Sequence, residues 1–184
     1  MVGNIKEQRV TDALSSLSEK WKGEKVTGEH TGTIGIKEGH IMLADGTPTS
    51  AIIVIDMKTI VVTDIEDPKS NARLTGHLNS SDFFNVEEHS TGTFEAKSFT
   101  PISGAKDREA NYTLSGKLTL KGITHDISFP AYIAVENGKL NATGKLTFDR
   151  SKYDIRYGSG SFFDGLGDKM IYDDFELSIN LSSL

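Results

Sequence analysis

LTGHLNSSDFFNVEEHSTGTFEAKSF, residues 74–99, is the segment around which the rest of the chain is organised. Its first part predicts the second half of a short helix over residues 69–79, because the larger side chains recur at helical spacing. The positions that share this helix face are Asn71, Leu74, His77 and Leu78. The polar residues 79–82 end the helix, and we expect the apolar residues of 83–86 to pack the following turn. From Thr91 the side chains alternate, which predicts a strand.

On both sides of this stretch the sequence predicts β-strands. Strands are expected at 17–23, 28–43, 50–62, 94–102, 111–120, 123–135, 140–148 and 175–181. Asp45-Gly46 and Asn137-Gly138 are typical of tight hairpins, because aspartate, asparagine and glycine adopt the positive φ that such turns need. The pattern predicts an all-β fold, an eight-stranded antiparallel barrel with one helix inserted between strands 3 and 4.

The apolar run at 50–62 is almost continuous and mostly β-branched, so it favours a strand over a helix. We expect both of its faces to be covered, one by the barrel interior and the other by the helix at 69–79. An eight-stranded barrel is just wide enough either to fill with side chains or to hold one slim ligand.

Three motifs, in this order, resemble the YceI-like family. They are S-x-D-F-F-x-V-E followed by T-x-T-F at 80–94, GKLTLKGITH followed by ISFP at 116–130, and FDRSKYD at 148–154. The resemblance covers roughly residues 17–184, and the chain departs from it at His89-Ser90, where many relatives carry an aromatic residue and a proline. It implies one lipocalin-like barrel domain at 17–184. Residues 1–16 are then a mobile N-terminal lead-in or a short helix.

Composition limits the partners that the protein can have. The net charge of −6 and the pI of about 5.4 argue against nucleic acid and anionic membranes, both of which attract basic proteins. Without cysteine the chain has neither a disulfide scaffold nor a thiolate metal site. No apolar run approaches the ~20 residues of a membrane span.

The first residues, MVGNIKEQRV, lack the apolar region of a signal peptide. The resemblance implies a periplasmic or secreted bacterial protein whose signal peptide has been removed. A cytoplasmic start and a trimmed terminus are the alternatives.

The sequence contains no motif that carries chemistry by itself. There is no Gly-x-Ser-x-Gly elbow, and the five histidines show no metal-ligand spacing. The acidic residues Asp164, Asp168, Asp173 and Asp174 lack the spacing of a calcium loop, so we interpret them as a solvated rim. We therefore expect no cofactor, no metal site and no catalytic residue.

A long loop, residues 149–169, separates the last two predicted strands. Ion pairs between Asp149 and Arg150 and between Lys152 and Asp154 are expected to pin it, each worth ~1 kcal/mol or less if exposed. Its glycines lack the lysine and helix of a phosphate-binding loop. They are expected to let Phe162 and Phe163 fold over one end of the barrel, either as a plug or as a gate.

The resemblance implies a protein that binds, transports or stores a long apolar lipid of isoprenoid type, a polyisoprenoid or an isoprenoid quinone, in the barrel interior. Each buried CH₂ group contributes ~0.8 kcal/mol, so a few isoprene units outweigh the cost of ordering the chain. From the family's arrangement and from strand alternation, the expected lining residues are Trp21, His30, Ile34, Ile53, Ile55, Phe94, Leu114, Phe129, Phe148 and Phe175. His30 is either a contact for the ligand head group or a hydrogen-bonded core residue.

Three other classes of protein stay open. One is a stress-linked structural barrel with a closed core, and another is a protein-interaction module with an exposed apolar strip. The third is a lipid-modifying enzyme, for which the sequence offers no polar constellation. The sequence also leaves a homodimer open.

Overall fold

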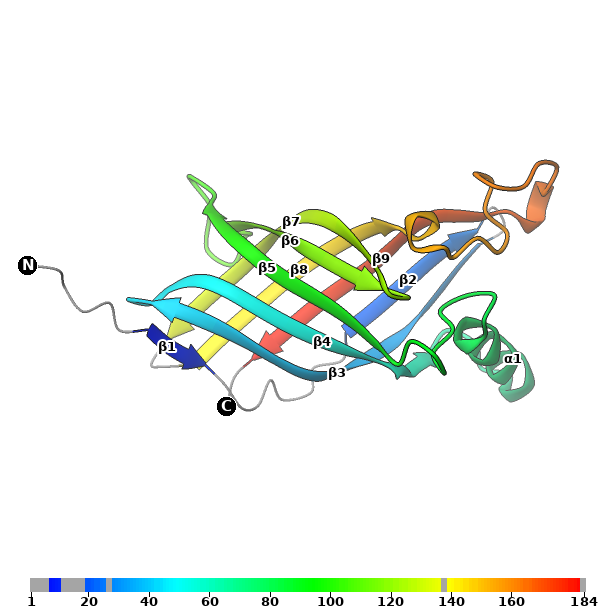
Figure 1. Ribbon diagram of the computed structural model, residues 1–184, viewed down its shortest axis with the longest axis horizontal. Helices are drawn as coiled ribbons and strands as arrows, with labels where there is room; N and C mark the ends of the chain where they lie inside the picture. The colour runs from blue at the N-terminus through cyan, green and yellow to red at the C-terminus, as the bar shows by residue number, and fades with distance from the viewer. Residues whose placement is uncertain (1–6, 11–18, 26–27, 137–138, 183–184) are drawn as a thin grey trace, which may run out of the picture.

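The computed structural model of this chain is a closed antiparallel barrel (Figure 1). It describes residues 7–10, 19–25, 28–136 and 139–182, with the backbone alone for 7–10 and 19–21. The strands are β1 Glu7–Val10, β2 Glu19–Lys25, β3 Gly28–Ala44, β4 Thr47–Val62, β5 Thr91–Pro101, β6 Tyr112–Leu120, β7 Ile123–Glu136, β8 Lys139–Asp149 and β9 Ile171–Ser182. The helices are α1 Pro68–Asn79 and the 3-10 helices η1 Arg150–Tyr153 and η2 Gly167–Lys169.

Eight strands, β2 to β9, close the barrel in the order β3-β2-β9-β8-β7-β6-β5-β4, and β4 pairs with β3. The eight-stranded prediction is therefore confirmed, and so is the position of the helix, which lies between β4 and β5, the third and fourth strands of the ring. The short strand β1 pairs with residues 41–44 of β3, beyond the part of β3 that pairs with β2. Part of the predicted lead-in is thus a strand rather than a helix.

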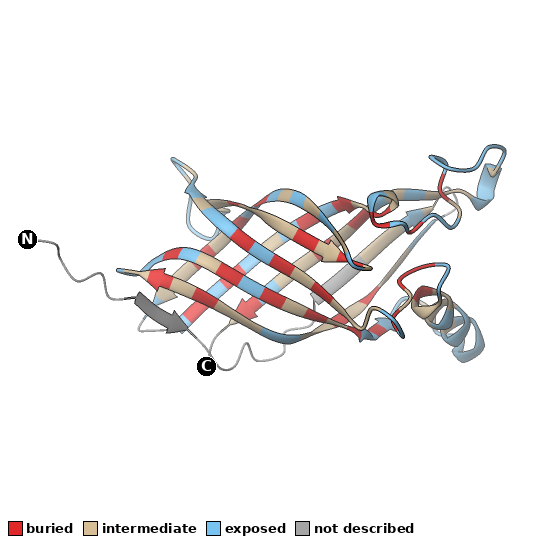
Figure 2. Cartoon of the chain, viewed as in Figure 1, coloured by how far each residue is buried: buried red, intermediate tan, exposed pale blue. Residues whose placement is uncertain are grey.

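Side-chain alternation places the core inside the barrel. Figure 2 shows buried and exposed residues alternating along the strands, as expected for a sheet with one dry face. In β4, Ile53 and Ile55 are buried, whereas Ile52 is 36% exposed and Val61 is 49% exposed. The predicted cover on both faces of this strand is therefore wrong. Helix α1 lies at one end of the barrel and leaves the outer face of β4 open (Figure 1).

Helix α1 is held to the end of β4 by its own polar residues. The Asp67 carboxylate accepts a hydrogen bond from the Ser70 backbone N–H at 2.8 Å, and Pro68 begins the first turn, where no N–H donor is required. The Asn71 amide donates to the carbonyls of Val62 and Ile65 at 2.9 and 3.1 Å. These contacts fix the helix beside the barrel end.

The segment after α1 turns back into the barrel. Its apolar residues Phe83, Phe84 and Val86 are 3%, 5% and 3% exposed, which confirms the predicted packing of this turn. Asn85 carries the positive φ of 50° that lets the chain reverse between them.

Among the described residues, no helix is long and apolar enough to cross a bilayer.

Candidate functional site

The barrel interior holds two small apolar cavities. The proximal cavity, on the side of α1, has a volume of about 30 Å³. It is lined by Ile34, Ile55, Met57, Ile60, Phe84, Leu118, Leu120, Phe148, Phe175 and Leu177. Because all of these side chains are apolar, this cavity can take up hydrocarbon but offers no hydrogen bond to a polar group.

The distal cavity lies toward the β3–β4 hairpin and has a volume of about 40 Å³. It is lined by Ile41, Ala51, Ile53, Phe94, Phe99, Leu114, Phe129, Ala131, Ile133, Ala142, Thr143, Gly144, Ile179 and Leu181. The two cavities share no lining residue, so packed side chains separate them. Both are far below the ~150 Å³ of an engineered cavity that binds benzene.

A third cavity, the helix pocket, lies between α1, the β2–β3 hairpin and the start of β9. Its volume is about 60 Å³. Its lining residues are Gly23, Glu24, Lys25, His30, Leu74, His77, Leu78, Phe83, Ile171 and Phe175. Unlike the interior cavities, it combines apolar walls with two imidazoles and a lysine.

Aromatic rings separate the helix pocket from the proximal cavity. Phe175 lines both spaces. The ring of Phe84 meets that of Phe175 edge to face with centroids 5.7 Å apart, and Phe83 lies 5.0 Å from Phe84. The helix pocket and the interior are therefore neighbours across one layer of aromatic side chains.

The two histidines of the helix pocket differ in their polar contacts. His30 Nδ1 lies 2.9 Å from the Asp64 carboxylate, which also accepts a hydrogen bond from the Thr31 backbone N–H at 3.0 Å. Although desolvation acts to raise the pKa of Asp64, these two hydrogen bonds outweigh it and lower that pKa below its ordinary value. His77 Nε2, by contrast, is buried without a hydrogen-bond partner.

The structure places most of the expected lining residues beside the interior cavities. Ile34, Ile55, Phe148 and Phe175 line the proximal cavity, whereas Ile53, Phe94, Leu114 and Phe129 line the distal cavity. His30 lies at the rim, in the helix pocket. The side chain of Trp21 is outside the described residues. That any of these side chains contacts a ligand stays a prediction.

The two phenylalanines expected to fold over the barrel end have exposed side chains. Phe162 and Phe163 are 44% and 50% exposed and line none of the three cavities. The Arg156 guanidinium lies 4.6 Å from the centroid of the Phe162 ring. The buried core includes Phe83, Phe84, Tyr153 and Ile155. That Phe162 and Phe163 act as a plug or a gate stays a prediction.

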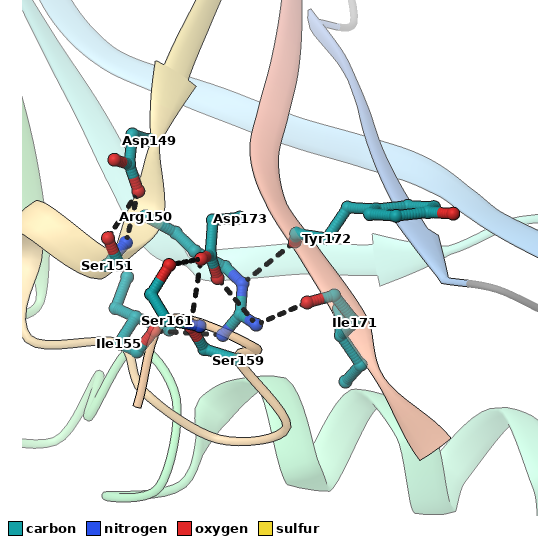
Figure 3. A network of polar contacts seen from close by, with 9 residues as sticks. All are labelled: Asp149, Arg150, Ser151, Ile155, Ser159, Ser161, Ile171, Tyr172 and Asp173. Atoms are coloured by element: carbon teal, nitrogen blue, oxygen red, sulfur yellow. Dashed lines mark hydrogen bonds and ion pairs between the residues drawn. The ribbon is translucent and has the colours of Figure 1, made fainter. Parts of the chain in front are cut away.

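A buried arginine organises the long loop after β8 (Figure 3). Arg150 is 0% exposed, and its guanidinium donates to the carbonyls of Ile155, Ile171 and Tyr172 at 2.9 to 3.1 Å. Its Nη2 lies 3.3 Å from a carboxylate oxygen of Asp173. Burial lowers the pKa of Arg150, and Asp173 and Asp149 act against that shift.

Both ion pairs predicted for this loop are wrong, because the acidic residue of each has a different partner. Asp149 accepts hydrogen bonds from the backbone N–H and hydroxyl of Ser151, and so caps η1 instead of pairing with Arg150. Asp154 pairs with Arg156 at 2.7 Å rather than with Lys152.

Asp173, predicted to be part of a solvated acidic rim, also belongs to this network. It accepts hydrogen bonds from the Ser159 and Ser161 hydroxyls at 2.9 and 2.6 Å.

Burial and the nearby Asp149 raise the pKa of Tyr153, inside the same loop, to about 12.

Sequence reasoning missed several of the residues around the cavities. Phe99 lines the distal cavity because the register of β5 shifts between Ala96 and Ser98, which reverses the strand's alternation. His77 and Phe83 were expected in the helix and its turn, but nothing in their spacing placed them beside β2 and β9. That proximity depends on the way α1 docks.

The outer surface carries a groove that is lined mostly by charged side chains. A groove over β2, β8 and β9 carries Glu24, Asp149, Asp174 and Glu176 together with Lys22. Within the described part of the chain, no group of three or more histidine, aspartate or glutamate side chains is placed to hold a metal ion.

Several solved structures share this fold. Burkholderia cenocepacia BcnA superposes with a TM-score of 0.70 at 19% identity, over 95% of this chain and 99% of that one. A polyisoprenoid binding domain from Saccharophagus degradans, described as implicated in plant cell wall breakdown, gives 0.64 at 15% identity, over 97% and 98%. The Campylobacter jejuni YCEI protein gives 0.54 at 16%, over 100% and 86%. No curated protein matches the sequence.

The family of this protein is shown by its sequence. Residues 9–183 match the YceI-like domain, which is nearly the whole chain and includes all three motifs from which the resemblance was first drawn. The eight-stranded barrel with one helix between its third and fourth strands agrees with that match. This protein therefore belongs to the YceI-like domain family.

Proposed function

We propose that this protein binds a long apolar chain of isoprenoid type inside the barrel, for transport or storage. The observation that carries the proposal is the pair of cavities along the interior, whose walls are almost entirely apolar. A hydrocarbon chain in this space gains ~0.8 kcal/mol for each CH₂ removed from water and needs no specific polar contact. The Saccharophagus degradans neighbour, described as a polyisoprenoid binding domain, supports this choice of ligand class.

The cavity volumes add a condition to this proposal. At about 30 and 40 Å³, the two cavities do not together accommodate several isoprene units, so binding requires interior side chains to move apart. The rings of Phe94 and Phe129, 5.2 Å apart beside the distal cavity, are among those that would have to rotate. Widening of the interior is therefore part of the proposed binding step.

We propose a binding protein rather than an enzyme. The Ser159 and Ser161 hydroxyls both donate to Asp173, a carboxylate already engaged by Arg150, which does not suit a proton acceptor for a nucleophile. The His30–Asp64 pair resembles the base and orienting group of a hydrolase. However, the structure shows no hydroxyl bonded to that imidazole among the described residues.

The small volumes favour a second candidate, a stress-linked structural barrel with a closed core. In that case the interior side chains serve only to stabilise the fold, and the cavities are ordinary packing defects. The two candidates differ in whether the purified protein takes up a prenyl chain.

Native mass spectrometry and solvent extraction of the purified protein test the proposal directly. We expect a co-purifying apolar lipid, or saturable one-to-one uptake of a fluorescent prenyl probe after delipidation. A protein without retained lipid that also fails to take up the probe would instead support the closed core. Bovine serum albumin and a small barrel with a filled core serve as positive and negative controls for the probe.

Location and assembly remain proposals as well. A periplasmic or secreted location follows from the family resemblance and is tested by fractionation of the source cells. Sedimentation of the purified chain tests the homodimer.

A further inference from the structure

The helix pocket contains a buried polar atom that the fold leaves unsatisfied. His77 Nε2 has no hydrogen-bond partner, although its ring is fixed by edge-to-face contacts with Tyr157 at 4.3 Å and Phe83 at 5.8 Å between centroids. Buried polar groups nearly always have a partner, so an unsatisfied nitrogen beside a cavity needs an explanation.

The charged groups around the pocket also favour a polar occupant. His30 Nδ1 lies 2.9 Å from the Asp64 carboxylate, which orients this imidazole in the pocket wall. Glu24 is engaged by Lys22 at 2.7 Å, whereas the described residues show no ion pair for Lys25. In an acidic protein, this pocket therefore brings two imidazoles and a lysine together with apolar walls.

The position of the pocket links it to the barrel interior. Phe175 lines both this pocket and the proximal cavity, and it contacts Phe83 of the pocket wall and Phe84 of the cavity wall. A ligand that filled both spaces would carry its hydrocarbon chain past these rings and leave its other end beside His77 and His30.

We propose that the helix pocket binds the polar end of the ligand, an oxygen-bearing head group that accepts a hydrogen bond from His77, with Phe83, Phe84 and Phe175 as the gate to the interior. This inference rests on the proposed function. It assigns the head group to the end of the barrel beside α1, where Tyr157 of the long loop also contacts His77. A phosphate, a carboxylate and a quinone carbonyl share the required chemistry.

The test compares ligands that differ only in their head group. Tetraprenyl phosphate, a tetraprenyl quinone and the tetraprenyl hydrocarbon without a head are each used to displace a fluorescent prenyl probe from the full chain. The variants are His77→Leu and His77→Gln, with His40→Leu as the control. His40 lies in β3 opposite the outward-facing Ile52, away from the pocket.

We expect His77→Leu to weaken at least one of the two head-bearing ligands by about tenfold, the usual loss for one hydrogen bond. His77→Gln should lose less because it keeps a donor, and neither variant should change binding of the headless hydrocarbon. The head group whose affinity falls identifies the chemistry that His77 recognises. His40→Leu should leave all three affinities unchanged.

Two outcomes overturn the inference and are distinguishable from each other. If wild type binds the ligands but His77→Leu changes none of them, or changes all three equally, the head group is not held in the helix pocket. If wild type binds none of the ligands, the proposed function fails together with this inference. Thermal melting of each variant shows that it is folded, and His77→Leu should melt no lower than wild type, because it removes an unsatisfied buried nitrogen.

Discussion

At the scale of single residues, the buried side chain of Arg150 connects several parts of the fold. Its guanidinium donates to three backbone carbonyls and forms an ion pair with Asp173 at 3.3 Å, and it lies 5.4 Å from the centroid of the Phe83 ring. It therefore joins the long loop, β9 and the segment after α1. A cation at this depth is tolerated only because its donors are paired.

Replacing Arg150 by methionine is expected to destabilise the protein by about 3–5 kcal/mol, because the substitution leaves three carbonyls without their donor and Asp173 without its ion-pair partner. Urea unfolding measures the loss. Lys145→Met is the matched control. It breaks the 2.8 Å pair with Glu176 at a lysine whose side chain is 63% exposed, and should cost about 1 kcal/mol or less. Equal losses in the two variants would contradict the structural role of Arg150.

Tyr153 gives a prediction about alkaline pH. Its pKa is raised from 10.0 to about 12, so above the ordinary value the unfolded state loses a proton that the folded state keeps. The resulting contribution to stability is complete below pH 10.0 and is lost as the pH rises toward about 12.

The Tyr153→Phe variant should therefore lose less stability than wild type between about pH 9 and about pH 11, which urea unfolding at the two values measures. Tyr172→Phe, at a tyrosine that is 45% exposed, should behave like wild type. A decline in Tyr153→Phe as steep as that of wild type would rule out a contribution from this hydroxyl.

At the scale of elements, β-bulges determine which side chains of a strand face the barrel interior. The register of β5 against β6 shifts between Ala96 and Ser98, and β3 against β4 shifts at three places. Each shift changes which residues face inward, as at Phe99. Close backbone approach accompanies the bulge in β5, because a Cβ on Gly116 would meet the Glu95 carbonyl oxygen at 2.0 Å.

Two glycine-to-alanine variants should therefore change stability in opposite directions. Gly116→Ala forces the β5–β6 pair apart and should cost at least about 1–3 kcal/mol. Gly76→Ala adds a methyl group to α1 where nothing lies within 4 Å, and should stabilise the protein by up to about 1 kcal/mol. Thermal melting distinguishes the two. A neutral Gly116→Ala would show that the strands can separate without loss.

At the scale of the whole molecule, the volume of the barrel interior distinguishes a lipid carrier from a barrel with a closed core. The barrel is closed by hydrogen bonds around its full circumference, so its wall is fixed while the side chains within it can rotate. Apolar side chains on the inside and polar ones on the outside suit both a lipid carrier and a closed core. The two functions differ only in how readily the interior opens.

Phe94→Ala tests that difference. Removing this buried ring from the wall of the distal cavity should cost about 3–5 kcal/mol in urea unfolding. If the barrel carries a lipid, the enlarged cavity should also change the affinity for a prenyl probe. A closed core predicts the same loss of stability without any uptake of the probe. Val61→Ala, on the outer face of β4, controls for nonspecific effects of truncating an apolar side chain.

Local patterns were enough to predict the class of fold, because alternation with a period of two and helical spacing are local properties of the chain. Strands of the right length, one helix after the third of them, and inward positions such as Ile53 and Phe129 could all be predicted in this way. The three motifs added the family. Local pattern was misleading where an apolar run suggested two covered faces, since Ile52 and Val61 face outward.

Tertiary packing determines which distant residues meet and how much space they leave. Arg150 pairs with Asp173 and not with its neighbour Asp149, and His77 reaches a pocket shared with β2 and β9. Phe162 and Phe163 are exposed and line none of the three cavities. These outcomes depend on register shifts, on helix docking and on the summed volumes of side chains from all eight strands. None of these is a property of a short segment.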